Sequence, residues 1–132
     1  MESASESDRE IQTLKQLRAC PEIFREIADF PGTSLQCQTR LRSRYPDELV
    51  RAAIALHEAR SQAKDLIPEA ESLWLTRVAL QQSTAREVAR HKARRFIGQS
   101  EVTDGCSGIG MDASEIAQHV PVNAVEMDPA MA

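Results

Sequence analysis

The sequence predicts a mainly helical N-terminal domain followed by the first β-α-β unit of an α/β fold. Apolar residues recur at helical spacing over most of the chain before residue 100, a pattern typical of amphipathic helices. Aromatic residues are few (three Phe, one Trp and one Tyr), so Leu, Ile, Val and Ala must supply the core, which suits helices. After residue 100 a glycine-rich loop lies between two short β-type runs, and this order predicts the α/β unit.

Length, composition and charge exclude several classes of protein. The 132 residues suit one ordinary domain, and 42% hydrophobic with 27% charged residues is close to a globular average. The formal net charge of -4 does not support a globally basic nucleic-acid-binding protein, but it leaves room for a local basic face. No apolar run approaches the roughly 18 residues of a membrane span, and the acidic first residues are unlike a signal peptide. No membrane association is therefore expected.

The cysteines favour neither a disulfide framework nor a zinc site. Cys20, Cys37 and Cys106 are odd in number and far apart, without a C-x-x-C pair, and the three histidines do not cluster with them. We therefore expect no metal. Reduced thiols are typical of cytoplasmic proteins, and the cytoplasm is the expected compartment.

The first three segments follow from composition and proline positions. Residues 1–8 are rich in Ser and Glu and are expected to form a disordered tail. A helix is predicted over 9–18, and a second begins at Pro21, whose missing N–H costs nothing in a first helical turn. The run Phe30-Pro31-Gly32 ends this second helix.

Two further helices are predicted before residue 65. Thr33 or Ser34 caps the first of them, which ends between residues 41 and 44. Pro46 opens the other, because proline suits the first turn and the two acids after it lie near the positive end of the helix dipole. This helix lasts to about Lys64.

Pro68 then interrupts the chain, and a strongly apolar stretch predicts a short helix over 70–81. Thr84, with Glu87 three residues later, matches a capping box. It predicts another helix that runs to about residue 96 and closes at Gly98. The helical domain is thus expected to cover 9–99.

The character of the sequence changes after residue 100. Val102-Thr103-Asp104 is a short β-type run, and the loop Gly105-Cys106-Ser107-Gly108-Ile109-Gly110 follows it. Residues 112–119 have helical content, and residues 122–126 form a second β-type run. Strand, glycine-rich loop, helix and strand in this order predict a β-α-β unit.

The glycine loop carries the strongest chemical signal. Gly108 and Gly110 lack a Cβ, so the backbone can turn sharply and approach a ligand, and the next helix directs unpaired N–H groups to the same place. Ligands of open parallel sheets bind outside the carboxyl ends of the strands. Asp104 ends the first run and Glu126 ends the second, where an acid suits the two hydroxyls of a ribose. These four residues predict a nucleoside pocket.

The loop differs from the dinucleotide fingerprint G-x-G-x-x-G, because its third glycine would stand at Ala113. A carboxylate at Asp104 would repel a pyrophosphate, whereas it suits a ligand with a cationic amino group. This favours S-adenosylmethionine over NAD.

These residues resemble a family. The stretch Val102-Thr103-Asp104-Gly105-Cys106-Ser107-Gly108-Ile109-Gly110-Met111-Asp112-Ala113 and the later Val125-Glu126-Met127-Asp128-Pro129 resemble the first two motifs of class I S-adenosylmethionine-dependent methyltransferases. The closer resemblance is to bacterial methyltransferases with a THUMP-like domain and to the RNA-cap guanosine-N2 (trimethylguanosine synthase) family. Segments within 75–91 and 44–63 also resemble the lead-in of those proteins, so the likeness covers about 40–129.

The resemblance implies a Rossmann-like cofactor domain starting at residue 100, and transfer of a methyl group to RNA, at a position such as guanine N2. The implied cofactor-binding residues are Asp104, Cys106, Gly108, Gly110, Glu126, Asp128 and Thr84. Asp104 would face the methionine amino group, and Glu126 would hold the ribose hydroxyls. Asp128 or Met127 would border the adenine. Many methyltransferases have glycine where this chain has Cys106, although cysteine matches the closer subgroup.

Two further features have alternative interpretations. Arg86, Arg90 and Arg94 fall on one helical stripe, which could contact RNA phosphates or be a solvated helix face. Trp74 could stack on a base or anchor a core poor in aromatic residues.

The predicted α/β unit is only the start of a methyltransferase fold, and the Asn/Asp-Pro-Pro-aromatic motif of the N2-methyltransferases is absent. We therefore expect an incomplete, N-terminal portion of the enzyme, inactive alone, with no catalytic group assigned. The alternative is a truncated, non-catalytic helical interaction module with a remnant cofactor-binding tail. A nucleotide-binding fragment is disfavoured by Asp104. An uncovered sheet edge would also favour self-association.

Overall fold

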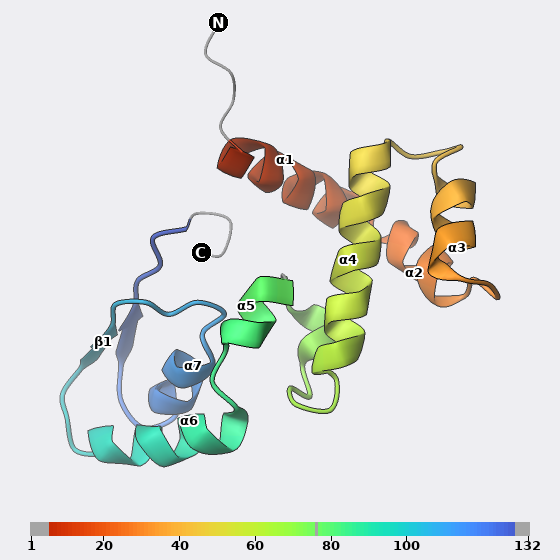
Figure 1. The fold of residues 1–132 in the computed structure, drawn as a ribbon. Helices are drawn as coiled ribbons and strands as arrows, with labels where there is room; N and C mark the ends of the chain where they lie inside the picture. The colour runs from red at the N-terminus through yellow and green to blue at the C-terminus, as the bar shows by residue number, and fades with distance from the viewer. Residues whose placement is uncertain (1–5, 76, 129–132) are drawn as a thin grey trace, which may run out of the picture.

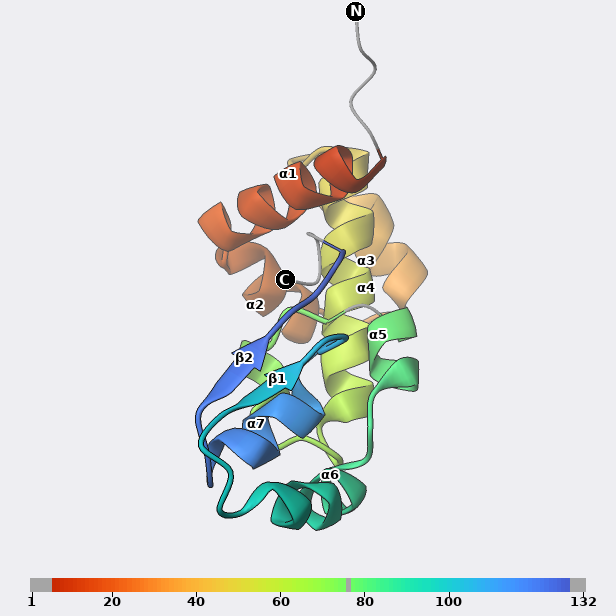
Figure 2. The ribbon, with the colours of Figure 1, turned by 90° about the vertical axis from the view of Figure 1, so that its left-hand side faces the viewer.

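The computed structural model describes residues 6–75 and 77–128, and in this part of the chain the fold is mainly helical with a two-stranded parallel sheet. Helices α1 to α4 gather at one end of the molecule, and the sheet lies with α6 and α7 at the other end (Figures 1 and 2). The predicted helical part and the later parallel strands are both confirmed at this level. No helix in the described ranges is long and apolar enough to cross a membrane.

The N-terminal end is built around a central helix. The helices are α1 (Glu6–Ala19), α2 (Glu22–Ala28), α3 (Ser34–Leu41) and α4 (Asp47–Ala63). The other three pack on α4. Their buried faces share one core, formed by Leu17, Ile23, Cys37, Leu41, Leu49, Val50 and Ala53. The expected tail over 1–8 is wrong for residues 6–8, which start α1, and its first five residues lie outside the described part.

A capping box starts α3 and resolves the choice between Thr33 and Ser34. The Thr33 Oγ1 accepts a hydrogen bond from the Gln36 N–H at 3.3 Å, and the Gln36 Oε1 accepts one from the Thr33 N–H at 3.0 Å. Two donors of the first helical turn are thereby satisfied.

Removing this cap is expected to destabilise the N-terminal core. The Thr33→Ala variant should lose about 1 kcal/mol of unfolding free energy, because the N–H of Gln36 loses its acceptor. Urea denaturation measures this. Thr39→Ala is the matched control, since the exposed Thr39 only donates to the Leu35 carbonyl of the same helix. Equal losses in both variants would contradict a capping role.

The segment after α4 departs from the predicted helix over 70–81. A 3-10 turn, η1 (Ala70–Ser72), is followed by extended backbone at Leu73, and α5 starts only at Arg77 (Arg77–Gln82). The Leu73 carbonyl accepts a hydrogen bond from the Arg60 Nε at 2.8 Å, so this acceptor is used by a side chain of α4. The Leu73 carbonyl therefore accepts from a distant side chain, and not from a backbone N–H as it would in the predicted helix.

Trp74 lies between two parts of the core. Its ring packs edge-on against Phe24, with 6.2 Å between centroids, and the guanidinium groups of Arg18 and Arg60 lie over it at 4.9 and 5.2 Å. It contacts the N-terminal core and also a second cluster around Leu56, Ile67 and Met111. Of the two interpretations of Trp74, stacking on a base or anchoring the core, the structure supports the core anchor.

The N-cap of the next helix lies one residue later than predicted. α6 (Arg86–Ala93) has Ala85 at the N-cap, without a side-chain hydrogen bond, so the capping box predicted at Thr84 is wrong. The Thr84 Oγ1 donates instead to the Asp112 Oδ2 at 2.8 Å. A 3-10 turn, η2 (Arg94–Phe96), follows, and the chain reverses at Gly98 with a φ of 90°, as expected of a glycine after a helix.

The β-α-β order is confirmed, with the first strand as predicted and the helix and the second strand shorter than predicted. The parallel strands β1 (Val102–Asp104) and β2 (Val122–Ala124) flank α7 (Met111–Ala117) in sequence, with Val102 opposite Val122. These two valines face a small core of Ala93, Ile116 and Val120. α6 packs closely on α7, so it stands with the sheet rather than with the first four helices (Figure 1).

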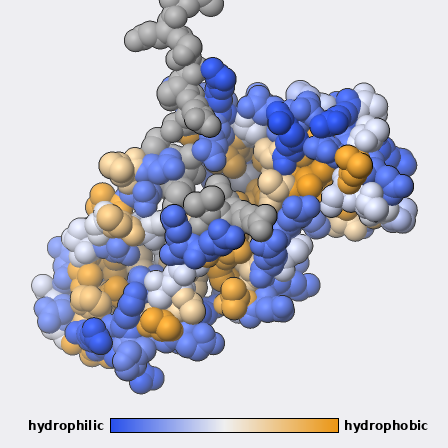
Figure 3. All heavy atoms as spheres, in the orientation of Figure 1, coloured by the Kyte–Doolittle hydropathy of each residue, from blue (hydrophilic) through white to orange (hydrophobic). Residues whose placement is uncertain are grey.

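One face of the small sheet is turned toward the viewer in Figure 2 and carries no helix. Thr103 and Asn123 on the strands are exposed. In the space-filling view of Figure 3, hydrophilic residues cover most of the visible face and apolar ones form small separate patches. Among the described residues, the large apolar side chains that are exposed are Leu35, Leu66, Val88, Ile97, Val125 and Met127. Self-association through the sheet edge stays a prediction.

Candidate functional site

A cavity of about 390 Å³ lies beside the glycine loop, in the size range of small-molecule sites. It is lined by Ala79, Gln82, Ser83, Thr84, Cys106, Ser107, Gly108, Ile109, Asp112 and Glu126. These residues come from the end of α5, the segment before α6, the glycine loop, the first turn of α7 and the chain after β2. Segments far apart in sequence thus meet where the parallel strands end.

The glycine loop takes a backbone shape that other residues rarely adopt. Gly108 has a φ of 54° and Gly110 a φ of 81°, both in the left-handed region that favours glycine. The Gly110 N–H donates to the Ser107 carbonyl at 2.8 Å, and Gly110 is the N-cap of α7. The Ser107 N–H donates to the Val125 carbonyl at 3.1 Å. The loop is therefore fixed both to the start of α7 and to the chain after β2.

Glu126 places a carboxylate against this loop. Its Oε2 accepts a hydrogen bond from the Gly108 N–H at 2.8 Å, and its Oε1 accepts one from the Asp128 N–H at 3.0 Å. Backbone hydrogen bonds, first from Asp128 and then from Gly108, lower the pKa of Glu126 below its ordinary value. The group is thus ionised at neutral pH. Each carboxylate oxygen has a second lone pair with which to accept from a ligand.

The predicted cofactor residues fall into two groups. Four of them line the cavity, namely Thr84, Cys106, Gly108 and Glu126. The other three, Asp104, Gly110 and Asp128, are not in its lining. The Asp104 Oδ1 accepts from the Cys106 N–H at 3.3 Å, so this carboxylate supports its own loop. Gly110 caps α7, and Asp128 donates its N–H to Glu126.

The cavity also has a polar cluster that the sequence did not reveal. The Asp112 Oδ2 accepts from the Thr84 Oγ1 at 2.8 Å and pairs with the Lys92 Nζ at 3.2 Å. The Lys92 Nζ also lies 3.5 Å from the Thr84 Oγ1. The position of Asp112, directly after the glycine loop and in the first turn of a helix, was a usable signal. Nothing in the spacing pointed to Lys92, which is 20 residues earlier in the chain.

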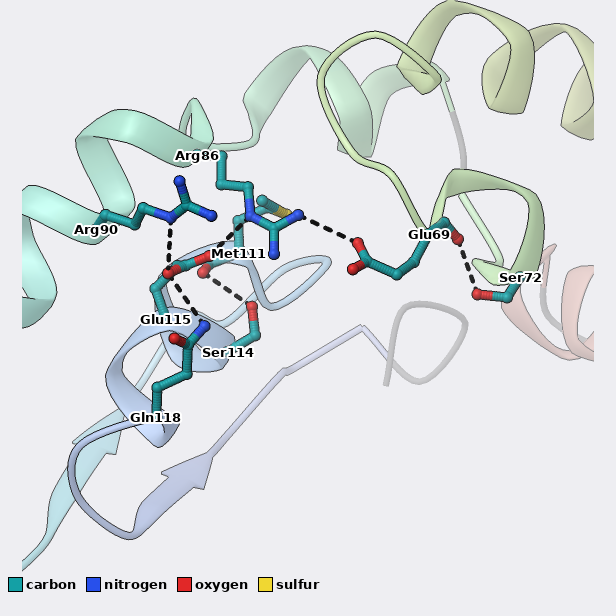
Figure 4. Close-up of polar contacts among 8 residues, drawn as sticks. All are labelled: Glu69, Ser72, Arg86, Arg90, Met111, Ser114, Glu115 and Gln118. Atoms are coloured by element: carbon teal, nitrogen blue, oxygen red, sulfur yellow. Dashed lines mark hydrogen bonds and ion pairs between the residues drawn. The ribbon is translucent and has the colours of Figure 1, made fainter.

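The arginine stripe of α6 is engaged with α7. The Arg86 Nε lies 2.9 Å from the Glu115 Oε1 and its guanidinium also reaches Glu69 at 3.2 Å, while the Arg90 Nε lies 3.4 Å from the Glu115 Oε2 (Figure 4). The side-chain hydrogen bond with Glu115 is the main cause that raises the pKa of Arg86. Arg94 is exposed. Two of the three arginines thus connect α6 to α7 through ion pairs with Glu115. RNA binding by this stripe stays a prediction.

Within the described ranges, no group of three or more His, Cys, Asp or Glu residues is arranged to hold a metal ion. Cys37 is buried, which raises the pKa of its thiol, and Cys106 is exposed at the cavity.

No known protein family, curated protein or solved structure matches this chain. The functional interpretation therefore depends on the geometry of the cavity and on the motifs in the sequence.

Proposed function

We propose that the cavity beside the glycine loop binds S-adenosylmethionine, and that the chain is the donor-binding, N-terminal portion of a class I methyltransferase with a Rossmann-like fold. The observation that carries this proposal is the position of Glu126. An ionised carboxylate stands just past the end of β2, a parallel strand, and is joined to the glycine loop by a 2.8 Å hydrogen bond. An acid at this place suits the two hydroxyls of a ribose.

The residues around Glu126 fit the adenosine part of the cofactor. Gly108 and Gly110 lack side chains at the turn of the loop, so a ligand can approach the backbone closely. The cavity volume of about 390 Å³ lies in the range of sites for ligands of this size. The spare lone pairs of the Glu126 carboxylate are the acceptors for the ribose hydroxyls.

The pair of Thr84 and Asp112 fits the ammonium of the methionine part. Both residues line the cavity, whereas Lys92 is outside the lining and positions the Asp112 carboxylate through an ion pair of 3.2 Å. Asp112 is in the cavity lining and Asp104 is not, so we assign the ammonium to Asp112 in place of Asp104. Asp104 then acts on the ligand only through the loop that it supports.

The same charges disfavour a dinucleotide. Asp112 and Glu126 both line the cavity, and two carboxylates would repel a pyrophosphate in a site of this size. A cationic sulfonium ligand would be attracted instead. S-adenosylmethionine supplies an electrophilic methyl group, and the contribution of this chain is to orient it.

The acceptor that we propose is an RNA base, with guanine N2 as the first candidate. The resemblance of the glycine loop and of its lead-in segments to the RNA-cap guanosine-N2 methyltransferases supports this choice. Arg94 is exposed on η2, whereas Arg86 and Arg90 of the predicted stripe pair with Glu115. We therefore assign the phosphate contact to Arg94.

Calorimetric titration tests the cofactor assignment. We expect saturable heat with S-adenosylmethionine at one site per chain, weaker binding of adenosine, and no binding of NAD. Adenosine lacks the methionine part, so the difference between the two ligands measures the contribution of the Asp112 cluster. Absence of saturable heat with S-adenosylmethionine at millimolar concentration, or preferential binding of NAD, would contradict the proposal.

A further inference from the structure

A second cavity, of about 400 Å³, lies between α2, α4 and η1. Its lining consists of Phe24, Arg25, Ala28, His57, Arg60, Ser61, Lys64 and Glu71. It shares no residue with the cavity beside the glycine loop. Three side chains in this lining are cationic and one is anionic, in a chain whose net charge is -4. The positive charge is therefore a local property of this cavity.

Within the part of the chain that the structure describes, the three cations of this basic cavity have no carboxylate partner at close range. Among the described residues, no ion pair within 4.0 Å involves Arg25, Arg60 or Lys64, whereas Arg86, Arg90 and Lys92 are all paired. Glu71 is the one acid in the lining. It raises the pKa of Arg60, but burial of the guanidinium has the larger effect and lowers that pKa below its ordinary value. A partly buried cation without close compensation favours a bound anion.

Arg60 is held in a fixed orientation within this cavity. Its Nε donates to the Leu73 carbonyl at 2.8 Å, and its guanidinium lies 4.9 Å from the centroid of Phe24 and 5.2 Å from that of Trp74. A guanidinium fork that is already oriented loses little conformational entropy when it binds an anion. Arg25 on α2 and Lys64 after α4 are exposed, so they can close on a ligand from two sides.

We propose that the basic cavity binds a phosphate group. The fixed Arg60 fork donates to two phosphate oxygens, and Arg25 and Lys64 supply the remaining positive charge. The Ser61 hydroxyl is a further donor at the same face of α4. A tetrahedral anion with up to two negative charges accepts from donors that do not share a plane, whereas the lone pairs of a carboxylate lie near one plane. The phosphate belongs either to a free small molecule or to a nucleotide. The inference does not rest on the proposed cofactor site.

Titration calorimetry with inorganic phosphate at low ionic strength tests the proposal. We expect saturable binding to the wild-type chain, and roughly tenfold or greater loss of affinity in the double variant Arg25→Ala/Lys64→Ala. Glu71→Gln should bind more tightly, by roughly threefold, because it removes the one nearby negative charge. The matched control is Arg9→Ala/Lys15→Ala, which removes two exposed cations of α1 outside the cavity and should leave the affinity unchanged.

Two results would overturn the proposal. One is an absence of saturable phosphate binding, or an equal loss of affinity in both double variants, which would mean unspecific attraction. The other is unchanged phosphate affinity in Arg25→Ala/Lys64→Ala together with a lower melting temperature. In that case Arg25 would only complement the negative end of the α2 dipole and Lys64 that of the α4 dipole. S-adenosylmethionine titration of the same variants keeps the two sites separate, since it should be unaffected.

Further ligands identify the source of the phosphate. Adenosine 5'-monophosphate is compared with inorganic phosphate and with a short single-stranded RNA, each against the wild-type chain and the Arg25→Ala/Lys64→Ala variant. Tighter binding of adenosine 5'-monophosphate or of the RNA than of inorganic phosphate, lost in the variant, would assign the cavity to the phosphate of a nucleotide. Equal or tighter binding of inorganic phosphate, also lost in the variant, would assign it to a free phosphate. Both results support a phosphate site.

Discussion

Replacing Glu115 with alanine is expected to lower the unfolding free energy by about 2 kcal/mol. Glu115 is 3% exposed, accepts hydrogen bonds from Arg86 and Gln118, and forms an ion pair with Arg90. The substitution removes the acceptor of the two donors and the charge partner of Arg90 at the interface of α6 and α7. It also leaves unfilled space beside α7, and both effects favour the unfolded state.

Urea denaturation of matched variants isolates the contribution of Glu115 to the unfolding free energy. Glu115→Gln keeps the volume and one carbonyl acceptor, so its loss should be smaller. Glu69→Ala removes the other partner of Arg86 from a side chain that is 60% exposed, and exposed ion pairs contribute little. An equal loss for Glu115→Ala and Glu69→Ala would show that the α6–α7 contact does not depend on the buried carboxylate.

Replacing Glu126 with glutamine is expected to weaken S-adenosylmethionine binding by roughly tenfold to a hundredfold. The amide has the shape of the carboxylate but carries a donor in place of one acceptor oxygen. Glutamine can therefore serve only one of the two backbone N–H groups, those of Gly108 and Asp128, that Glu126 now accepts from. The loop and the ribose both lose a charged acceptor.

The pH dependence of this binding follows from the lowered pKa of Glu126. A carboxylate whose pKa is lower in the folded chain contributes stability above its unfolded pKa, and that stability is lost as the pH falls through the folded pKa. We therefore expect affinity to persist through the ordinary glutamate range and to fall only at lower pH. Glu126→Gln should lack this acid limb.

Calorimetry from neutral to acidic pH measures both effects. Glu87→Gln is the matched control, because Glu87 is an exposed acid of α6 outside the cavity, and its affinity should equal that of the wild type. If Glu126→Gln bound S-adenosylmethionine as the wild type does, the carboxylate would not be the ribose acceptor. Equal S-adenosylmethionine affinity in Glu126→Gln, Glu87→Gln and the wild type would contradict the role of Glu126, on which the cofactor proposal mainly depends.

Local features of the chain could be predicted from sequence. Pro21 and Pro46 mark helix starts to within a residue or two, because proline restricts the chain locally. The positive φ of Gly98 and the sharp loop at Gly108 and Gly110 follow from the freedom of glycine. The order of β1, α7 and β2 depends on similarly local signals.

The errors arise where a distant partner decides the local structure. Thr84 looks like a helix cap, but its hydroxyl binds Asp112, 28 residues later. The predicted helix over 70–81 is broken where Arg60 binds the Leu73 carbonyl, 13 residues apart. Spacing along the chain does not show either pair.

The candidate site shows the same division. The position of Glu126 at the cavity is predictable from sequence, because it follows the end of a parallel strand, where such sheets bind ligands; its role toward a ligand stays a prediction. Lys92 was missed, because only the packing of α6 on α7 brings its amine to Asp112. For the same reason the sequence does not show that Arg86 and Arg90 form ion pairs with Glu115 of α7.

Trp74 gives the molecule an internal optical probe. It is the one tryptophan of the sequence, and it packs on both the N-terminal core and the cluster that includes Met111 of α7. Its indole also lies 5.2 Å from the Arg60 guanidinium that lines the basic cavity. Tryptophan emission therefore monitors, without any label, how tightly the two ends of the molecule are joined and what charge lies beside Arg60.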